Sequence, residues 1–350
     1  MSSFSSHALS DWMKQAGPDG DVVISSRVRL ARNLNHQPFP LLATSNQSNE
    51  VLEQLASVSE SGILEPFGSF TTIRLKDLSE LERRVLVEKH LISPSLANDS
   101  RAGAVVLSEN EAISVMINEE DHLRIQCLHP GFQIREAWAL ANDIDDSYEA
   151  VLEFAFDEHK GYLTTCPTNV GTGLRASVMM HLPALVLTQQ INRILSAVSQ
   201  VGLTVRGLYG EGSEALGNLF QISNQITLGQ SEDEIIDNLY GVAKQIIEHE
   251  KAARRKLMNE SYRRLEDRIK RSYGILRYAS IIDSKEAAQR LSDVRLGADL
   301  GILTEVAPQV YNELLIMTQP GFLQKRYDEK LSPDDRDYKR AELIRESLNK

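Results

Sequence analysis

Cysteine is scarce in this 350-residue chain, which has only Cys127 and Cys166. Two thiols cannot form the disulfide framework of a small secreted domain, and no CxxC or His-rich cluster offers zinc-ligand spacing. The sequence also lacks a run of about 18 apolar residues that could span a membrane, and its first residues lack the basic start and apolar core of a signal peptide. These absences predict a cytoplasmic protein that does not enter a membrane.

Basic residues are outnumbered, with 38 Lys and Arg against 49 Asp and Glu, and the formal charge is −11. A surface of that sign repels phosphate backbones and anionic lipids, so we expect no direct binding to nucleic acid. Apolar residues make up 42% and charged residues 25%, which is typical of a globular chain. No internal repeat or low-complexity tract is present.

Hydrophobic patterning predicts an α+β fold with a mainly antiparallel sheet flanked by helices. We expect strands over 21–30, three within 104–128, 161–166, 203–209 and 219–226, and helices over 48–58, 77–91, 133–157 and 174–201, the last interrupted near Pro183. From Ser231, which forms a capping-box pattern with Glu234, the sequence indicates helices only. The expected domains are 1–255 and an all-helical 256–350.

The first predicted strand carries two arginines on one face. Arg27 and Arg29 are two residues apart, whereas Val28 and Leu30 point to the other face. Two guanidinium groups side by side are unsuited to a hydrophobic core and well suited to an anion. A pair of surface arginines on an edge strand is the alternative.

Acidic residues are absent from residues 161–210, although fifty residues of average composition would hold seven. This segment contains the loop Gly171-Thr172-Gly173 together with Arg175, Arg193 and Arg206. A glycine-rich loop and the start of the following helix could bind phosphate in a positive local field. A buried stretch that excludes acids is the alternative. The dinucleotide pattern is incomplete because no acidic residue occurs before Glu211, and no Lys follows the glycines as in a Walker motif.

Cys166 is the last residue of the strand predicted over 161–166 and precedes Pro167. The nearby loop and arginines would favour its thiolate form, although most single cysteines are buried and unreactive. A phosphatase nucleophile would need an arginine at position 172, where the sequence has Thr172. Covalent phosphorylation of Cys166 is therefore not expected.

The segment Asn118-Glu119-Glu120-Asp121 places three carboxylates in a tight loop, and Arg124 follows. Acidic hairpin turns are common, so an ordinary turn is one interpretation. Paired carboxylates also suit guanidinium chemistry, in which one orients the planar group and the other removes a proton.

Four motifs together resemble the catalytic domain of the phosphagen kinase (ATP:guanido phosphotransferase) family. They are SSRVRLAR (25–32), NEEDHLR (118–124), CPTNVGTGLRAS (166–177) and RGLYGEG (206–212). The resemblance covers about residues 20–250 and points to the bacterial protein arginine kinases of this family. Members that act on small guanidino compounds carry a helical domain before the first motif, whereas 24 residues precede Ser25 here. We therefore expect an acceptor pocket open to arginines in proteins.

The resemblance implies transfer of the ATP γ-phosphoryl group to an arginine guanidinium. It makes Glu120 the base and Glu119 its neighbour, lets Cys166 stabilise the guanidinium, and places Glu211 on the other side of the acceptor. Phosphate contacts are expected from Arg27, Arg29, Arg124, Arg175 and Arg206, and backbone contacts from Ser25, Ser26, Val28, Ala176, Ser177, Val178, Met179, Gly207, Leu208, Tyr209, Gly210 and Glu211. His90 is a candidate beside the adenine, with an exposed surface histidine as the alternative. Mg²⁺ is expected to be held mainly by phosphates and water.

The helical segment contains a second motif of the protein arginine kinases. Arg336, Asp337, Arg340 and Ala341 match RDxxRA, which the resemblance links to allosteric phosphoarginine binding. Arg336 and Arg340 would lie on one face of a helix that starts at Ser332 and Pro333. Ordinary charge pairing of Asp337 with either arginine is the alternative.

The resemblance also implies partners: protein substrates that include a heat-shock repressor, a AAA+ protease system, an activator protein, and a second copy of the chain bound through the helical domain. Two other functions stay open at this point. The chain could be a phosphoarginine-binding module without catalysis, or a kinase of free arginine.

Overall fold

The computed structural model describes residues 9–14, 17–98, 102–206, 216–305 and 308–349. Its centre is an eight-stranded sheet with the strand order β2-β3-β4-β5-β1-β8-β10-β9. The strands are β1 (Val23–Arg32), β2 (Phe70–Arg74), β3 (Ala104–Ser108), β4 (Ile113–Ile117), β5 (Leu123–Pro130), β8 (Leu174–His181), β9 (Leu203–Arg206) and β10 (Leu219–Asn224). Every neighbouring pair is antiparallel, which confirms the predicted α+β fold.

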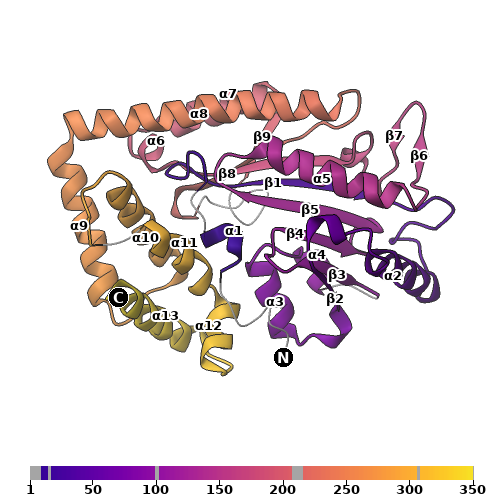
Figure 1. The fold of residues 1–350 in the computed structure, drawn as a ribbon. Helices are drawn as coiled ribbons and strands as arrows, with labels where there is room; N and C mark the ends of the chain where they lie inside the picture. Colours follow the sequence, from indigo (N-terminus) through magenta and orange to yellow (C-terminus); the bar gives the residue numbers. More distant parts are fainter. Residues whose placement is uncertain (1–8, 15–16, 99–101, 207–215, 306–307, 350) are drawn as a thin grey trace.

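Helices cover one face of this sheet (Figure 1). Helix α5 (Ile134–Glu149) packs on β1 and β5, and α8 (Glu232–Glu260) packs on β8 and β10. The remaining helices before β10 are α1 (Asp11–Lys14), α2 (Ser45–Glu60), α3 (Glu80–Glu88), α4 (Pro94–Asn98), α6 (Pro183–Leu187) and α7 (Ile191–Gln200). Val28 and Leu30 of β1 are fully buried in the core under α5 and α8. The alternate residues of β1 therefore point to the opposite face, where the candidate site lies.

Two predicted elements between residues 160 and 201 are wrong. Residues 174–181 form the central strand β8 instead of the start of a long helix, and only α6 and α7 are helical in this region. The strand expected over 161–166 is reduced to β7 (Gly161–Tyr162), which pairs with β6 (Phe156–Asp157). Helix α5 also ends at Glu149, earlier than expected. A short and largely apolar run does not by itself distinguish a buried strand from a helix.

The chain after β10 is helical, as expected. Helix α8 starts at the capping box of Ser231 and Glu234 and continues across residue 255. It is followed by α9 (Tyr262–Tyr278), α10 (Ser284–Asp299), α11 (Pro308–Met317), α12 (Pro320–Tyr327) and α13 (Pro333–Leu348). These helices enclose a second hydrophobic core around Ile269, Leu296 and Leu314.

Buried charges join the helical segment to the sheet. Arg254 of α8 binds Glu250 and the carbonyl oxygen of Asp21, and Arg295 of α10 binds Asp299 and the carbonyl oxygen of Gly20. Each carboxylate lies on the same helix as its arginine, so the links between the two parts are the hydrogen bonds to the carbonyl oxygens of Gly20 and Asp21, just before β1.

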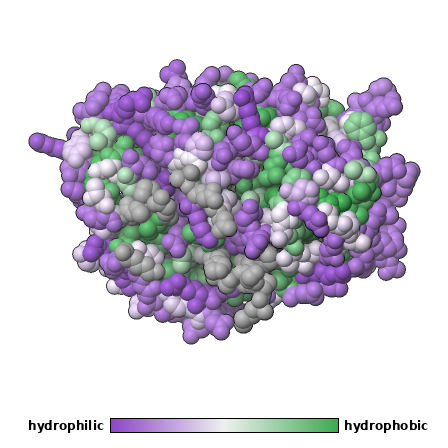
Figure 2. Space-filling model, viewed as in Figure 1, coloured by the Kyte–Doolittle hydropathy of each residue, from purple (hydrophilic) through white to green (hydrophobic). Residues whose placement is uncertain are grey.

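The face seen in Figure 2 is mostly hydrophilic, with hydrophobic residues gathered in separate patches. None of the helices in the described part of the chain has the length and apolar character needed to span a bilayer.

Candidate active site

Strand register aligns the outward side chains of three central strands. Arg27 of β1 lies opposite Ser177 of β8 and Leu128 of β5, and Arg29 lies opposite Arg175 and Gln126. Directly opposite residues on neighbouring strands point to the same face. The prediction that Arg27 and Arg29 share a face is confirmed, and because β1 is a central strand, the alternative of an edge-strand pair is wrong.

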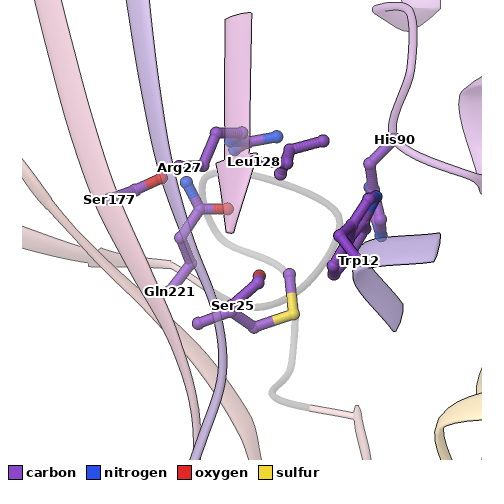
Figure 3. Close-up of a pocket in the computed structure, with 8 residues that line it drawn as sticks. Trp12, Ser25, Arg27, His90, Leu128, Ser177 and Gln221 are labelled. Carbon is purple, nitrogen blue, oxygen red and sulfur yellow. The ribbon is translucent and has the colours of Figure 1, made fainter. Parts of the chain in front are cut away.

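One end of this row of side chains forms a narrow pocket (Figure 3). Its walls are Trp12, Ser25, Arg27, His90, Leu128, Ser177, Met179 and Gln221. His90 follows α3, has a positive φ of 60°, and faces this pocket, so the alternative of an exposed surface histidine is wrong. Burial, and to a smaller extent the Arg27 charge, lower the pKa of His90 to about 4. Its imidazole is therefore neutral at pH 7 and can exchange hydrogen bonds with a heterocyclic base.

The next pocket along the row has a volume of about 420 Å³ and is rich in arginine. Its lining residues are Arg29, Ala31, Glu120, Arg124, Cys166, Thr168, Asn169, Gly173, Arg175, Arg206 and Gln225. Four guanidinium groups from β1, β5, β8 and β9 converge here. A multiply charged anion such as a polyphosphate fits this field better than any neutral ligand.

Arg27 and Arg29, at the centre of the row, carry positive charges that are unfavourable in the absence of a bound anion. Burial, and then the charges of Arg124 and Arg175, lower the pKa of Arg27 to about 10. Burial and the neighbouring arginines hold the pKa of Arg29 well below its usual value. Within the described ranges, Arg29 Nε is buried and has no hydrogen-bond partner. A buried donor of this kind is a site prepared for a negatively charged ligand.

The two glutamates of the 118–121 turn hold Arg124 between them. Glu119 Oε2 lies 2.6 Å from Arg124 Nη1, and Glu120 Oε2 lies 2.8 Å from Nη2. Glu119 also accepts hydrogen bonds from Ser93 Oγ and the Glu120 amide, and its side chain is only 3% exposed. Glu120 is 40% exposed and lines the arginine-rich pocket. Of the two, Glu120 is therefore accessible to a ligand and Glu119 fixes the geometry.

A third and wider pocket, of about 660 Å³, adjoins the second. Its walls are Pro40, Leu41, Ser48, Ser95, Ala102, Asn118, Glu119, Glu120, Thr165, Cys166 and Pro167. Among residues that the structure describes, only Glu120 and Cys166 line both this pocket and the arginine-rich one. Cys166 Sγ lies 3.0 Å from Thr168 Oγ1. A group entering through the wide pocket would meet the anion at these two side chains.

Several residues with expected nucleotide contacts turn their side chains away from the pockets. Val28, Ala176 and Val178 point into the hydrophobic core, and the hydroxyl of Ser26 donates to the Gly131 carbonyl oxygen. Because β1 lies between β5 and β8, and β8 lies between β1 and β10, their backbone groups are used in the sheet. The side chains of Ser26, Val28, Ala176 and Val178 therefore do not line the pockets, whereas the alternate side chains do, and the backbone contacts expected from these four residues stay a prediction. Similarly, Gly173 leads into a strand, so no helix N-terminus is available there for phosphate.

Some expected residues lie outside the described part of the chain: Gly207, Leu208, Tyr209, Gly210 and Glu211. Sequence reasoning missed several pocket residues, among them Trp12, Asn169 and Gln221. Gln221 follows the same alternation as Met179, its opposite residue on β8, so strand periodicity could have indicated it. Trp12 is contributed by α1, far away in sequence, and no local pattern indicates its position.

The RDxxRA segment lies on α13, whose N-cap is Ser332 with Pro333 in the first turn, as predicted. Arg340 is 2% exposed and donates to the carbonyl oxygens of Thr318 and Ile282 and to Asp337. The guanidinium group of Arg340 is therefore occupied inside the helical core, and binding of one phosphate by both Arg336 and Arg340 stays a prediction. The alternative, pairing of Asp337 with Arg340, is present, and Arg336 remains partly exposed.

The chemistry of the pockets suits nucleotide phosphates better than a protein-bound metal. Among residues whose positions are described, no group of three His, Cys, Asp or Glu side chains is placed to bind a metal ion. The carboxylates nearest the arginine-rich pocket already bind Arg124. These residues do not form a magnesium cage.

Comparison with known proteins agrees with this geometry. The profile of the ATP:guanido phosphotransferase C-terminal catalytic domain matches residues 39–253. The chain belongs to this family. The profile of the protein-arginine kinase McsB C-terminal domain matches residues 262–350. The resemblance to phosphagen kinases drawn from four motifs is thus confirmed, and the chain is an ATP-dependent phosphotransferase with a guanidino acceptor.

Curated relatives of this guanido phosphotransferase match almost its whole length. A protein-arginine kinase of Brevibacillus brevis is 62% identical over 99% of the chain and 97% of the relative. One of Bacillus subtilis is 56% identical over 99% of the chain and 95% of the relative. Among solved structures, lombricine kinase is 26% identical, with a TM-score of 0.57 over 69% of the chain and 70% of that structure. These matches confirm the expected fold and enzyme class.

Proposed function

We propose that this enzyme phosphorylates arginine side chains of proteins. The observation that carries the proposal is the junction of two pockets at Glu120 and Cys166. One pocket presents arginines to a polyphosphate, and the other is wide and bordered by Leu41, whose side chain is 81% exposed. The relatives named protein-arginine kinase support the same acceptor.

Each side chain of the site would have its own role in this reaction. ATP would place its base by Trp12 and His90 and its phosphates among Arg27, Arg29 and Arg175, with Mg²⁺ carried on the phosphates and water. A guanidinium nitrogen attacks the γ-phosphorus, the bond from this phosphorus to the oxygen bridging to the β-phosphate breaks, and ADP leaves. The proton lost by the nitrogen passes to Glu120. Converging guanidinium groups stabilise the charge on the transferred group.

Arg124 and Cys166 would help to orient the guanidinium group of the substrate arginine. Arg124 holds the Glu120 carboxylate through Oε2, which leaves Oε1 for the substrate. Cys166, on the other wall of the junction, would lie beside the substrate guanidinium without bonding to it. Orienting the planar group between a carboxylate and this sulfur favours a lone pair on one nitrogen.

The proposal predicts stable transfer of phosphate to protein arginine. Incubation with ATP and an arginine-containing protein should add 80 Da increments that are lost in acid, and fragmentation should place them on arginine. Free arginine serves as the competing acceptor. Phosphorylation of free arginine without any on protein would assign a small-molecule kinase. Phosphoarginine binding without either reaction would assign a binding module.

We propose in addition that Arg336 and Asp337 bind phosphoarginine at a second site. Arg336 is partly exposed and could pair with the phosphate. Asp337 is 30% exposed and is held by Arg340, so that its carboxylate can accept from the modified guanidinium. Arg340 and the buried Ala341 support this site from inside the helical core.

Phosphoarginine is therefore expected to bind the wild-type enzyme and to lose at least tenfold in affinity in Asp337→Asn, because the neutral amide cannot make the charge-assisted hydrogen bond that the carboxylate makes to a guanidinium donor. Calorimetry measures this affinity. Asp335→Asn, on the exposed first turn of the same helix, is the matched control and should bind as the wild type does. Equal affinity in both variants would leave Asp337 with a structural role only.

Further proposals rest on the similarity to bacterial protein-arginine kinases. Residues 1–255 would form the catalytic domain, and residues 256–350 would bind phosphoarginine and form a homodimer. Substrates would include a heat-shock repressor, with an activator and a AAA+ protease system as cytoplasmic partners in the stress response. The separate profile matches to residues 39–253 and 262–350 support this division.

A further inference from the structure

The rim of the wide pocket carries two leucines in contact with solvent. Leu41 is 81% exposed and Leu42 is 78% exposed, the highest values for large hydrophobic residues in the described part of the chain. They belong to the mouth loop, residues 38–43, between β1 and α2. Single exposed apolar residues are common, but two adjacent ones beside a reaction site need a reason.

The mouth loop is fixed to the catalytic turn. The ring of Phe39 packs edge-on against His122, with 6.4 Å between centroids, and His122 Nε2 lies 3.1 Å from the Pro38 carbonyl oxygen. His122 is two residues beyond Glu120, so the position of the loop follows the position of the proposed base. Burial lowers the pKa of His122, which keeps this ring uncharged.

The other side of the loop is equally restrained. The amides of Leu42 and Ala43 donate to the Phe39 carbonyl oxygen at 2.8 and 3.0 Å, and Thr44 then caps α2. Ala43 is buried, so the chain cannot turn the leucines inward without losing this turn. The two leucines are therefore held in solvent by a rigid support.

We propose that Leu41 and Leu42 form a docking surface for apolar residues next to the target arginine of a protein substrate. This inference rests on the proposed function. Leu41 lines the same pocket as Glu119, Glu120 and Cys166, so the surface is continuous with the acceptor site. When a guanidinium reaches Glu120, the substrate backbone lies at the pocket mouth. Side chains flanking the arginine then cover the leucines and remove both apolar surfaces from water.

The surface selects among arginines by sequence context. An apolar residue beside the target arginine would contact Leu41 and Leu42, whereas a small polar residue there would leave both leucines exposed to water. Discrimination from one or two apolar contacts is modest, and we expect about tenfold in kcat/KM. Free arginine has no flanking residues and gains nothing from this surface.

Two peptides with one central arginine, flanked on both sides by Leu or by Ser, test the inference. The wild-type enzyme should phosphorylate the Leu peptide with about tenfold higher kcat/KM, measured by ADP release. In Leu41→Ser combined with Leu42→Ser, the ratio between the peptides should fall to about one, whereas Leu41→Met combined with Leu42→Met should keep the preference. Val151→Ser, at an exposed apolar residue beyond α5, is the control and should keep the wild-type ratio.

The outcomes separate the inference from the function on which it rests. Equal kcat/KM for both peptides in the wild-type enzyme would overturn the docking surface and leave the kinase function intact, whatever the variants do. A preference for the Leu peptide that survives in the double Ser variant would also overturn it. Phosphorylation of free arginine but of neither peptide would contradict the proposed protein substrate itself.

Discussion

Glu120→Gln is expected to lower phosphoryl transfer to arginine by about a thousandfold, within the range usual for loss of a general base. The amide keeps the size of the side chain and an oxygen for Arg124, but it cannot take the proton that the guanidinium must lose. Glu120 is the exposed member of the pair and faces both pockets. The measurement is single-turnover formation of phosphoarginine at saturating ATP.

ATP binding should survive this change, because the pocket at Trp12 and His90 and most of the phosphate-binding arginines do not contact Glu120. Nucleotide-induced thermal stabilisation measures it directly. Glu119→Gln is the comparison, since Glu119 is buried against Arg124 and Ser93 and should affect geometry more than proton transfer. Near wild-type turnover in Glu120→Gln would remove this residue from the role of base.

Arg29→Met is expected to stabilise the ligand-free enzyme while lowering turnover by about a thousandfold. The Nε atom of Arg29 is buried without a hydrogen-bond partner, and desolvation lowers the pKa of the guanidinium, so the unliganded enzyme keeps this charge at a cost in folding free energy. Replacing a poorly paired buried charge by an apolar side chain of similar length should raise stability by about 1 kcal/mol. The melting temperature should then rise by about 2 °C.

The same variant should lose most of its thermal stabilisation by ATP, because Arg29 is central to the arginine-rich pocket. Arg193→Met is a matched control on the exposed face of α7 and should change neither ATP binding nor turnover. A lower melting temperature in Arg29→Met with unchanged ATP binding would instead indicate a structural arginine.

Local pattern was sufficient for much of the fold and for part of the site. The alternation around Arg27 and Arg29 placed both on one strand face, because side-chain direction in a strand has a period of two whatever the surroundings. The turn at 118–121 and the capping box at Ser231 are likewise short-range features. The family motifs indicated the reaction before any geometry was available.

The error at residues 174–181 did not come from a missing strand pattern. Leu174, Ala176, Val178 and Met180 point into the core, whereas the alternate residues Arg175, Ser177 and Met179 face the pockets, so the period of two is present. The segment is short and is followed by a long helix-forming stretch, and pairing with β1 and β10 makes it a strand.

By itself, the sequence determined the strand faces, the helix caps, the paired glutamates and the guanido phosphotransferase family, because each depends on residues close together or on motifs in order. The tertiary structure decided which residues meet. It brought Trp12 and His90 to one pocket, buried Arg340 against Asp337, and joined two pockets at Glu120 and Cys166. These contacts depend on packing between segments far apart in the chain, whose relative positions no local periodicity specifies.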